Sequence, residues 1–271
     1  MAMTGIAMTR VARRPLGSAA ASWRLVDRNF RAYLRGWIFF LTGFLEPVLY
    51  LFSIGVGVGA LVEGGFEFNG QVVTYAAFVA PGMLAASAMN GAVLDSTFNI
   101  FFKLKFEKLY DSILATPMRV GDVARGVITW ALLRGGLYSA GFLVVMVAMG
   151  LVASWWAVLA LPAALLIGYA FAGVGMALTT FMRSWQDFEF VQLAIMPMFL
   201  FSATFFPVDR FDGVLRWVVE ATPLYRGVVL CRELTTGALS WDSAISVLYL
   251  AAMGTLGLVV VSRRLHKLLL S

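Results

Sequence analysis

The amino-acid sequence predicts an all-α, polytopic membrane protein with six transmembrane helices. Of its 271 residues, 61% are hydrophobic and only 13% are charged, a balance that is unusual for a soluble domain. The long apolar stretches do not alternate polar with apolar residues, so they favour helices over a β-barrel. A bilayer core of ~30 Å needs ~20 helical residues. Six stretches reach that length within a few residues: about 36–62, 72–100, 123–150, 152–181, 188–206 and 244–261.

Basic residues are distributed asymmetrically, which predicts the orientation of these spans. The first 35 residues hold seven arginines and one acid, and the segment 103–125 holds five Lys and Arg residues. The loops at 63–71 and 151–154 hold none. By the positive-inside rule, both termini and the loops at 103–125 and 182–187 face the cytoplasm. This placement of the net charge of +6 fits a lipid bilayer and argues against a nucleic-acid partner.

The amino-terminal region precedes the predicted transmembrane domain, residues 36–271. Residues 1–18 are expected to be disordered, and residues 19–35 to form an interfacial amphipathic helix along the cytoplasmic leaflet. Its apolar stripe is Ala19, Trp23, Val26, Phe30 and Tyr33, and its basic stripe is Arg24, Arg28, Arg31 and Arg35. The alternative is an extension of the first span into the cytosol.

Away from the ends of the predicted spans, three ionisable residues fall inside them: Glu46, Asp95 and Arg134. A charge in the bilayer centre costs ~2.5–3.5 kcal/mol on insertion scales, so such groups usually pair. At 1.5 Å per residue, Glu46 and Arg134 both lie ~15 Å from the cytoplasmic side. We therefore favour a Glu46–Arg134 pair. A pair of Arg134 with Asp95, or a neutral hydrogen-bonded carboxyl, remains open.

The first span also carries residues that predict close helix packing. Pro47 follows Glu46, and Gly55 and Gly59 form a small-xxx-small face on which another helix can approach. We expect Pro47, Gly55 and Gly59 to belong to the framework between helices.

Two connections are predicted to hold short helices. "KFEKLYDSILATP" predicts a helix over 106–115 that ends before Pro117, with a stripe that packs on its own spans or docks a partner. The stripe is Phe106, Leu109, Tyr110, Ile113 and Leu114. The 207–243 connection predicts two helices, about 212–221 and 224–236, broken at Pro223 and ended at Gly237. Both are shorter than a bilayer, which favours re-entrant or interfacial helices on the outer side.

The sequence offers no catalytic or metal-binding constellation. It has no GxxxxGK[ST], HExxH or CxxC pattern, one histidine (His266) and one cysteine (Cys231). We therefore expect no enzyme activity, metal or cofactor in this chain, and an energy source that is an ion gradient or another polypeptide.

Four ordered segments resemble the ABC-2 type permeases, in particular the nodulation-exporter and daunorubicin-exporter branch. They are "LEPVLYLFSIGVGVG" in the first span, "YAAFVAPGMLAASAMNGA" in the second, "YDSILATPMRVGDVARG" in the cytoplasmic loop and "FFPVDRF…TPLYRGVVLCREL" in the outer connection. The resemblance covers nearly the whole chain in the right order.

The resemblance implies the membrane subunit of a bacterial ATP-binding cassette exporter in the inner membrane. Two permease copies, identical or sister chains, would join two P-loop ATPase subunits, which bind the ATP and Mg. The cargo would be an amphiphile such as a drug, a lipid or a lipid-linked glycan. An ATPase-independent secondary transporter or channel is the alternative function, and a structural membrane scaffold is a third.

The resemblance also implies roles for residues of the two connections. The segment 107–120 would include the coupling helix that contacts an ATPase. Its implied coupling residues are Glu107, Leu109, Tyr110, Asp111, Ile113, Leu114, Thr116, Pro117 and Met118. The outer half-helices would help to close the external side. The implied outer gate is Phe205, Phe206, Pro207, Pro223, Leu224 and Tyr225.

Overall fold

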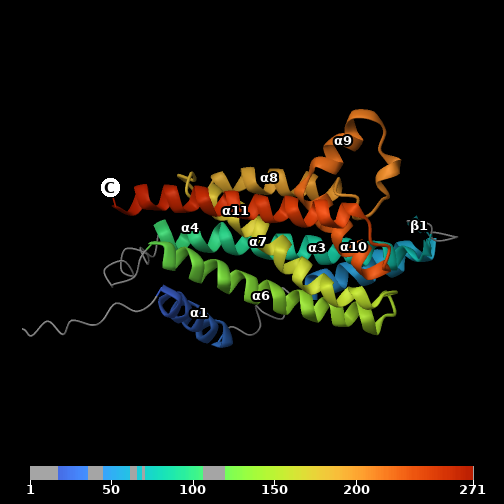
Figure 1. The fold of residues 1–271 in the computed structure, drawn as a ribbon, viewed down its shortest axis with the longest axis horizontal. Helices are drawn as coiled ribbons and strands as arrows, with labels where there is room; N and C mark the ends of the chain where they lie inside the picture. The colour runs from blue at the N-terminus through green and yellow to red at the C-terminus, as the bar shows by residue number, and fades with distance from the viewer. Residues whose placement is uncertain (1–17, 36–44, 62–65, 69–70, 106–119, 271) are drawn as a thin grey trace, which may run out of the picture.

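The computed structural model describes residues 18–35, 45–61, 66–68, 71–105 and 120–270, and the statements below concern these residues. Long helices run side by side along the longest axis of the molecule (Figure 1). One end holds α1 and the carboxyl terminus, and we call it the α1 end. The opposite end holds strand β1 with helices α9 and α10, and we call it the hairpin end.

Four of the predicted spans are found as long apolar helices. They are α3 (Tyr75–Ser96) continuing into α4 (Phe98–Lys105), α6 (Val120–Ala148), α7 (Ala160–Thr179) after the 3-10 helix η3 (Trp155–Leu159), and α11 (Trp241–Leu270). The segments long and apolar enough to cross a bilayer are Tyr75–Phe102, Arg125–Ala148, Trp155–Thr179 and Trp241–Arg264. These correspond to the second, third, fourth and sixth predicted spans.

The other two predicted spans have a different form. Residues 45–50 are α-helical and continue into a π-helix, η1 (Leu51–Val58), and a 3-10 turn, η2 (Gly59–Leu61), while residues 36–44 lie outside the described part. Helix α8 (Asp187–Leu200) has 14 residues and ends before the predicted limit of 206. At 1.5 Å per residue it covers ~21 Å, less than a bilayer core.

Helix α8 is followed by a turn that contains hydrogen-bonded polar side chains. Ser202 Oγ donates to the carbonyl of Phe199 at 3.0 Å and lies 2.7 Å from Thr204 Oγ1. Ala203 has a left-handed backbone with φ of 54°. The apolar composition continues through Phe205 and Phe206, so the sequence pattern alone did not reveal this corner.

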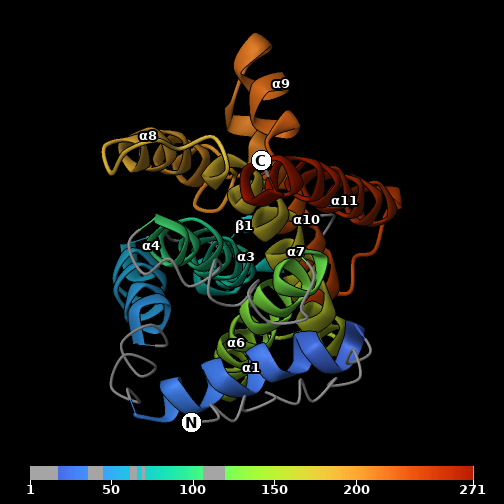
Figure 2. The same cartoon turned by 90° about the vertical axis from the view of Figure 1, so that its left-hand side faces the viewer.

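Helix α1 (Ser18–Arg35) is the predicted amphipathic helix, and it crosses α6 at the α1 end (Figure 2). Leu25 and Val26 are buried, and Ser22 Oγ donates to the carbonyl of Asp122 at 2.9 Å. Trp23 and Phe30 of the predicted apolar stripe are exposed. The face that packs on the bundle is therefore rotated toward Leu25, which leaves an apolar face for lipid.

The core lies around α3 and α7, which occupy the middle of the bundle (Figure 2). Small residues allow close approach there. A Cβ added at Gly173 of α7 would lie 2.7 Å from the carbonyl oxygen of Gly254 in α11. Any side chain at position 173 would force these two helices apart.

The hairpin end contains the short elements of the fold. Strands β1 (Phe66–Phe68) and β2 (Gln71–Val73) pair antiparallel, with Phe66 opposite Val73. The sequence analysis missed this hairpin, although the Asn69-Gly70 pair between the strands is a typical hairpin-turn dipeptide. The 3-10 turn η4 (Val208–Arg210) precedes α9 (Gly213–Ala221) and α10 (Pro223–Thr236).

The 207–243 connection contains two helices, α9 and α10, close to the two ranges expected from the sequence. Thr222 Oγ1 caps α10 by accepting from the backbone N–H of Tyr225 at 3.3 Å, and Pro223 is its first residue. Gly237 ends the helix with φ of 82°. Local capping residues fix both helix ends, which is why their bounds could be read from the sequence.

Candidate functional site

The intramembrane charges form a buried ion pair between α3 and α6. Arg134 Nη2 lies 2.8 Å from Asp95 Oδ1, and the two side chains are 10% and 5% exposed. Asn99 Nδ2 donates to the same carboxylate oxygen at 2.7 Å, and the Arg134 guanidinium lies 5.7 Å from the ring centre of Tyr138. The favoured Glu46–Arg134 pair is therefore wrong, and the alternative with Asp95 is the one that forms.

Glu46 faces away from the bundle, because the next two residues, Pro47 and Val48, face into it. Pro47 and Val48 are buried, whereas Glu46 is exposed. Estimating depth along each helix gave Glu46 and Arg134 the same level, but it could not show which way Glu46 points. A carboxylate is thus left on the outside of a segment that the sequence assigns to the membrane.

The glycines of the first span lie against α3, as expected for a packing face. A Cβ added at Gly55 would lie 3.4 Å from Ala76 Cβ, and one at Gly59 would lie 3.8 Å from Tyr75 Cβ. Both contacts fall on the first turn of α3. Gly55 lies in the π-helix η1 and Gly59 begins the 3-10 turn η2, and π-helical turns concentrate at functional sites.

All nine predicted coupling residues lie in 106–119, outside the described residues. The helix that leads into this segment, α4, packs against the turn between α7 and α8. Ring centres of Phe98 and Phe102 lie 5.1 Å from that of Trp185, and Phe101 lies 5.2 Å from Phe188. Sequence reasoning missed this aromatic cluster, although "FNIFF" and Trp185 were visible as unusually dense aromatic residues.

The predicted outer-gate residues gather at the hairpin end, but they do not all share one environment. Phe205 and Leu224 are buried in the same hydrophobic core, and Phe205 meets Phe199 edge-on at 5.2 Å between ring centres. Phe206 is exposed. Burial, with the Glu220 carboxylate as the next cause, raises the pKa of the Tyr225 hydroxyl. Pro207 and Pro223 each stand at the start of a short helix.

Arg232 of α10 is a buried cation that sequence reasoning did not single out. Its Nε donates to the carbonyl of Phe78 at 3.1 Å, and its Nη2 donates to the carbonyls of Ala203 at 2.9 Å and Thr204 at 3.4 Å. The guanidinium lies 3.8 Å from the ring centre of Phe78. Burial lowers its pKa to about 9, so it stays charged at neutral pH.

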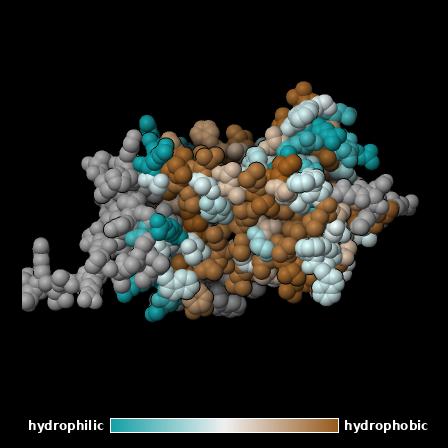
Figure 3. Space-filling model, in the orientation of Figure 1, coloured by the Kyte–Doolittle hydropathy of each residue, from teal (hydrophilic) through white to brown (hydrophobic). Residues whose placement is uncertain are grey.

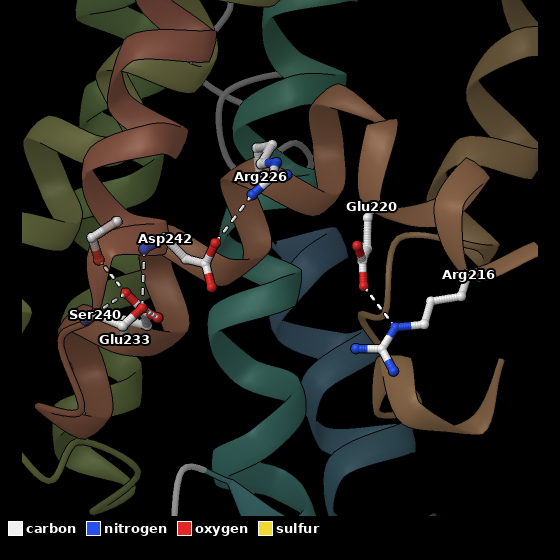
Figure 4. A network of polar contacts seen from close by, with 7 residues as sticks. Arg216, Glu220, Arg226, Glu233, Ser240 and Asp242 are labelled. Carbon is white, nitrogen blue, oxygen red and sulfur yellow. Dashed lines mark hydrogen bonds and ion pairs between the residues drawn. The ribbon is translucent and has the colours of Figure 1, made fainter. Parts of the chain in front are cut away.

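The neighbouring carboxylate, Glu233, joins α10 to the start of α11 (Figure 4). It accepts hydrogen bonds from the backbone N–H of Ser240 at 3.2 Å, from Ser240 Oγ at 2.5 Å and from Ser243 Oγ. Arg226 Nη1 lies 3.4 Å from Asp242 Oδ1, across the same pair of helices. The adjacent opposite charges in "LCREL" were the available signal, because they interrupt an apolar helix face.

Helix α9, which projects at the hairpin end, carries ion pairs on its surface. Arg216 Nε donates to Glu220 Oε1 at 2.8 Å on α9 (Figure 4). Arg216 Nη1 also lies 3.4 Å from Asp209 Oδ1. The opposite face of α9 exposes Val214, Trp217 and Val218. This helix therefore has one charged and one apolar face, as expected at a membrane surface.

Comparison with known proteins gives the family. The ABC-2 type transporter family matches residues 21–235. Nodulation protein J of Rhizobium leguminosarum bv. trifolii is 36% identical over 222 residues, which cover 80% of each chain. Nodulation protein J of Rhizobium meliloti (strain 1021) is 32% identical over 223 residues, covering 80% of this chain and 81% of the relative. That of Neorhizobium galegae is 30% identical over 235 residues, covering 85% and 87%.

The family match runs from α1 into α10, and the four long apolar helices fit a protein that crosses a membrane several times. The chain therefore belongs to the ABC-2 type transporter family, in the branch of the nodulation J proteins, and is a membrane-spanning transport subunit.

Proposed function

We propose that this chain is the permease of an exporter that moves an amphiphilic substrate out of the cytoplasm with ATP hydrolysed by separate subunits. The observation that carries the proposal is the family match over residues 21–235. ATP and Mg would bind to two partner ATPases and not to this chain. A drug, a lipid or a lipid-linked glycan fits the apolar surface of the bundle equally well.

The proposed topology has six spans in the bacterial inner membrane, with the α1 end in the cytoplasm. Hydrophobic side chains cover the middle of the visible face, and hydrophilic ones lie toward its two ends (Figure 3). Exposed tryptophans stand at both ends: Trp155, Trp217 and Trp241 at the hairpin end, and Trp23 and Trp185 at the α1 end. Tryptophan is enriched at both membrane interfaces, and the positive-inside rule then sets the direction.

A second copy of the permease is proposed to cover α8 and the first span. No residue of α8 is buried, and Figure 2 shows α8 to one side of the other long helices. Phe190, Leu193 and Met196 are exposed along it. Glu46 would meet lipid at a cost of ~2.5–3.5 kcal/mol unless protein or water covered it. A partner copy would provide that cover.

Coupling is proposed to run through 106–119 into the bundle by way of α4. The aromatic cluster that joins α4 to the start of α8 supports this route, because packed rings transmit displacement between elements. Movement imposed on the segment after Lys105 would thereby reach α8.

The test is transport by the chain reconstituted in vesicles with its ATPase partner. We expect uptake of a fluorescent amphiphile into inside-out vesicles that requires ATP, is blocked by vanadate and survives a protonophore. Uptake that needs only an ion gradient and no ATPase would overturn the proposal and establish the secondary-transporter alternative.

A further inference from the structure

The turn after α8, residues Ser202, Ala203 and Thr204, is held in a conformation that its sequence does not favour; we call it the α8 corner. Ala203 adopts φ of 54°, a left-handed backbone that is uncommon for alanine. All three residues are buried, and the hydroxyl groups of Ser202 and Thr204 hydrogen-bond to each other at 2.7 Å. Surrounding contacts must therefore hold this turn in place.

Those contacts come from Arg232, which joins the α8 corner to two other helices. Its Nη2 donates to the carbonyls of Ala203 and Thr204, at 2.9 and 3.4 Å. Its Nε donates to the carbonyl of Phe78 in α3 at 3.1 Å. A single side chain of α10 thus ties the end of α8 to the central helix of the bundle.

The α8 corner also sits directly on the backbone of α3. A Cβ added at Gly82 would lie 2.9 Å from Thr204 Cγ2 and 3.1 Å from Thr204 Cα. Only glycine at position 82 leaves enough space for Thr204 to pack in this position. Arg232 and Gly82 therefore both contact the α8 corner, Arg232 by hydrogen bonds to its carbonyls and Gly82 by close packing against Thr204.

The partners of Arg232 suit a contact that breaks and re-forms. In the described part of the chain no carboxylate pairs with it; it meets carbonyl oxygens and the rings of Phe78 and Phe68, at 3.8 and 5.6 Å from the ring centres. Separating a buried ion pair would leave two buried charges without their partners. Withdrawal of the α8 corner separates no ion pair; it removes the hydrogen bonds of Arg232 to Ala203 and Thr204 and leaves the one to the carbonyl of Phe78.

We propose that Arg232 is the positioning residue that holds the outer side of the transport pathway closed, and that outward opening releases the α8 corner from it and from Gly82. The side chains of α8 are at most partly buried, with Val191, Ile195 and Phe199 packed against the core, so the fully buried corner is the firmest attachment of the outer end of this helix. Its release would let the outer end of α8 move. This inference rests on the proposed export function, but its first test does not need transport.

The test measures how often the α8 corner opens. In a background with Cys231→Ser, a reporter Ser202→Cys replaces a buried hydroxyl by a thiol, and its labelling by a membrane-impermeant maleimide is timed without ATP. Hydrogen bonds to a charged group are worth enough that Arg232→Gln should speed labelling roughly 10- to 100-fold. Arg232→Lys keeps the charge but has fewer hydrogen-bond donors. Its labelling rate should lie between those of the parent and of Arg232→Gln.

A second reporter cysteine distinguishes local opening of the α8 corner from a general loosening of the fold. Ser246→Cys lies on α11 near the same end and is fully buried. Its labelling should not change with Arg232→Gln. Equal acceleration at both reporters, or none at Ser202→Cys, would overturn the proposal. If Arg232→Gln fails to insert, Ala203→Gly decides, because glycine removes the φ strain and should slow labelling about threefold; an unchanged rate contradicts the proposal.

A cross-link then connects the α8 corner to transport. A Cβ at Gly82 would lie 3.3 Å from Thr204 Cβ, close to the spacing of a disulfide. The pair Gly82→Cys and Thr204→Cys should export less when oxidised than when reduced. Each single variant should export equally under both conditions, whatever the added Cβ at position 82 costs, so a redox-dependent loss belongs to the disulfide alone. Equal export by the oxidised and the reduced pair would contradict the gate. Absence of ATP-driven export in every variant would instead reject the proposed function and leave the labelling result standing.

Discussion

Asp95 and Arg134 form a buried ion pair between α3 and α6. Each side chain is nearly buried and neutralises the other at 2.8 Å. Removing one partner takes this ion pair from a buried charge, a change that costs about 3–5 kcal/mol. We therefore expect Asp95→Asn or Arg134→Met to lower the membrane level and the Tm of the purified protein, and a charge swap at both positions to restore part of the loss.

The control for this pair is an exposed one. Arg31 and Asp27 lie 2.8 Å apart on α1, with side chains 75% and 47% exposed. Such pairs contribute about 0–1 kcal/mol, so Asp27→Asn should leave the Tm close to that of the parent. Equal losses for Asp27→Asn and Asp95→Asn would show that burial does not decide the effect.

Cys231 should report unfolding and not local motion. It is fully buried, and burial raises the pKa of its thiol to about 12. The thiolate is the reactive form, so at pH 8 only about one thiol in ten thousand is reactive. We expect no labelling of native protein by N-ethylmaleimide at pH 8 and rapid labelling above the Tm. Rapid labelling of the folded protein would contradict the burial of α10.

Sequence reasoning at the residue scale located the buried charges but not their pairing. Composition alone shows that Glu46, Asp95 and Arg134 interrupt apolar stretches. Which partners meet depends on the rotation of each helix about its axis. Pro47 turns inward and sends Glu46 outward, and that rotation is set by packing between helices far apart in the chain.

Helices α9 and α10 are expected to stay on the outer side without crossing the membrane. Their lengths are 9 and 14 residues, and acids and arginines interrupt them. With Cys231 replaced, Asp209→Cys and Asp242→Cys, at two exposed positions that flank these helices, should label from outside only. Labelling of either site from the cytoplasm would show that the six-span topology is wrong.

Elements with local signals were predictable, and those set by distant contacts were not. Thr222, Pro223 and Gly237 mark the ends of α10 in the sequence itself. The end of α8 depends on Arg232 and Gly82, which are distant in the chain, so an apolar run hid it. The hairpin at 66–73 was too short for its alternation to stand out against the flanking apolar residues.

At the scale of the whole molecule, the long helices connect the α1 end of the bundle to the hairpin end, where the α8 corner lies. The chain enters the bundle beside α6 at the α1 end and reaches the α8 corner and Arg232 at the hairpin end. The family was recognisable from four ordered motifs. A second copy and an ATPase, in contrast, lie outside one chain, so its sequence names them only through the resemblance.

The most direct test of the account is the effect of the 106–119 segment on ATP use. Tyr110→Ala with Ile113→Ala removes two apolar side chains from the proposed ATPase contact, and loss of such anchors often costs ~2 kcal/mol or more. The measurement is ATPase co-purification and ATP-driven uptake, with Lys105→Ala as a charge-removal control. We predict that the double variant inserts normally but binds less ATPase or hydrolyses ATP without transport, while Lys105→Ala matches the parent. Transport at the parent rate by the double variant would contradict the account.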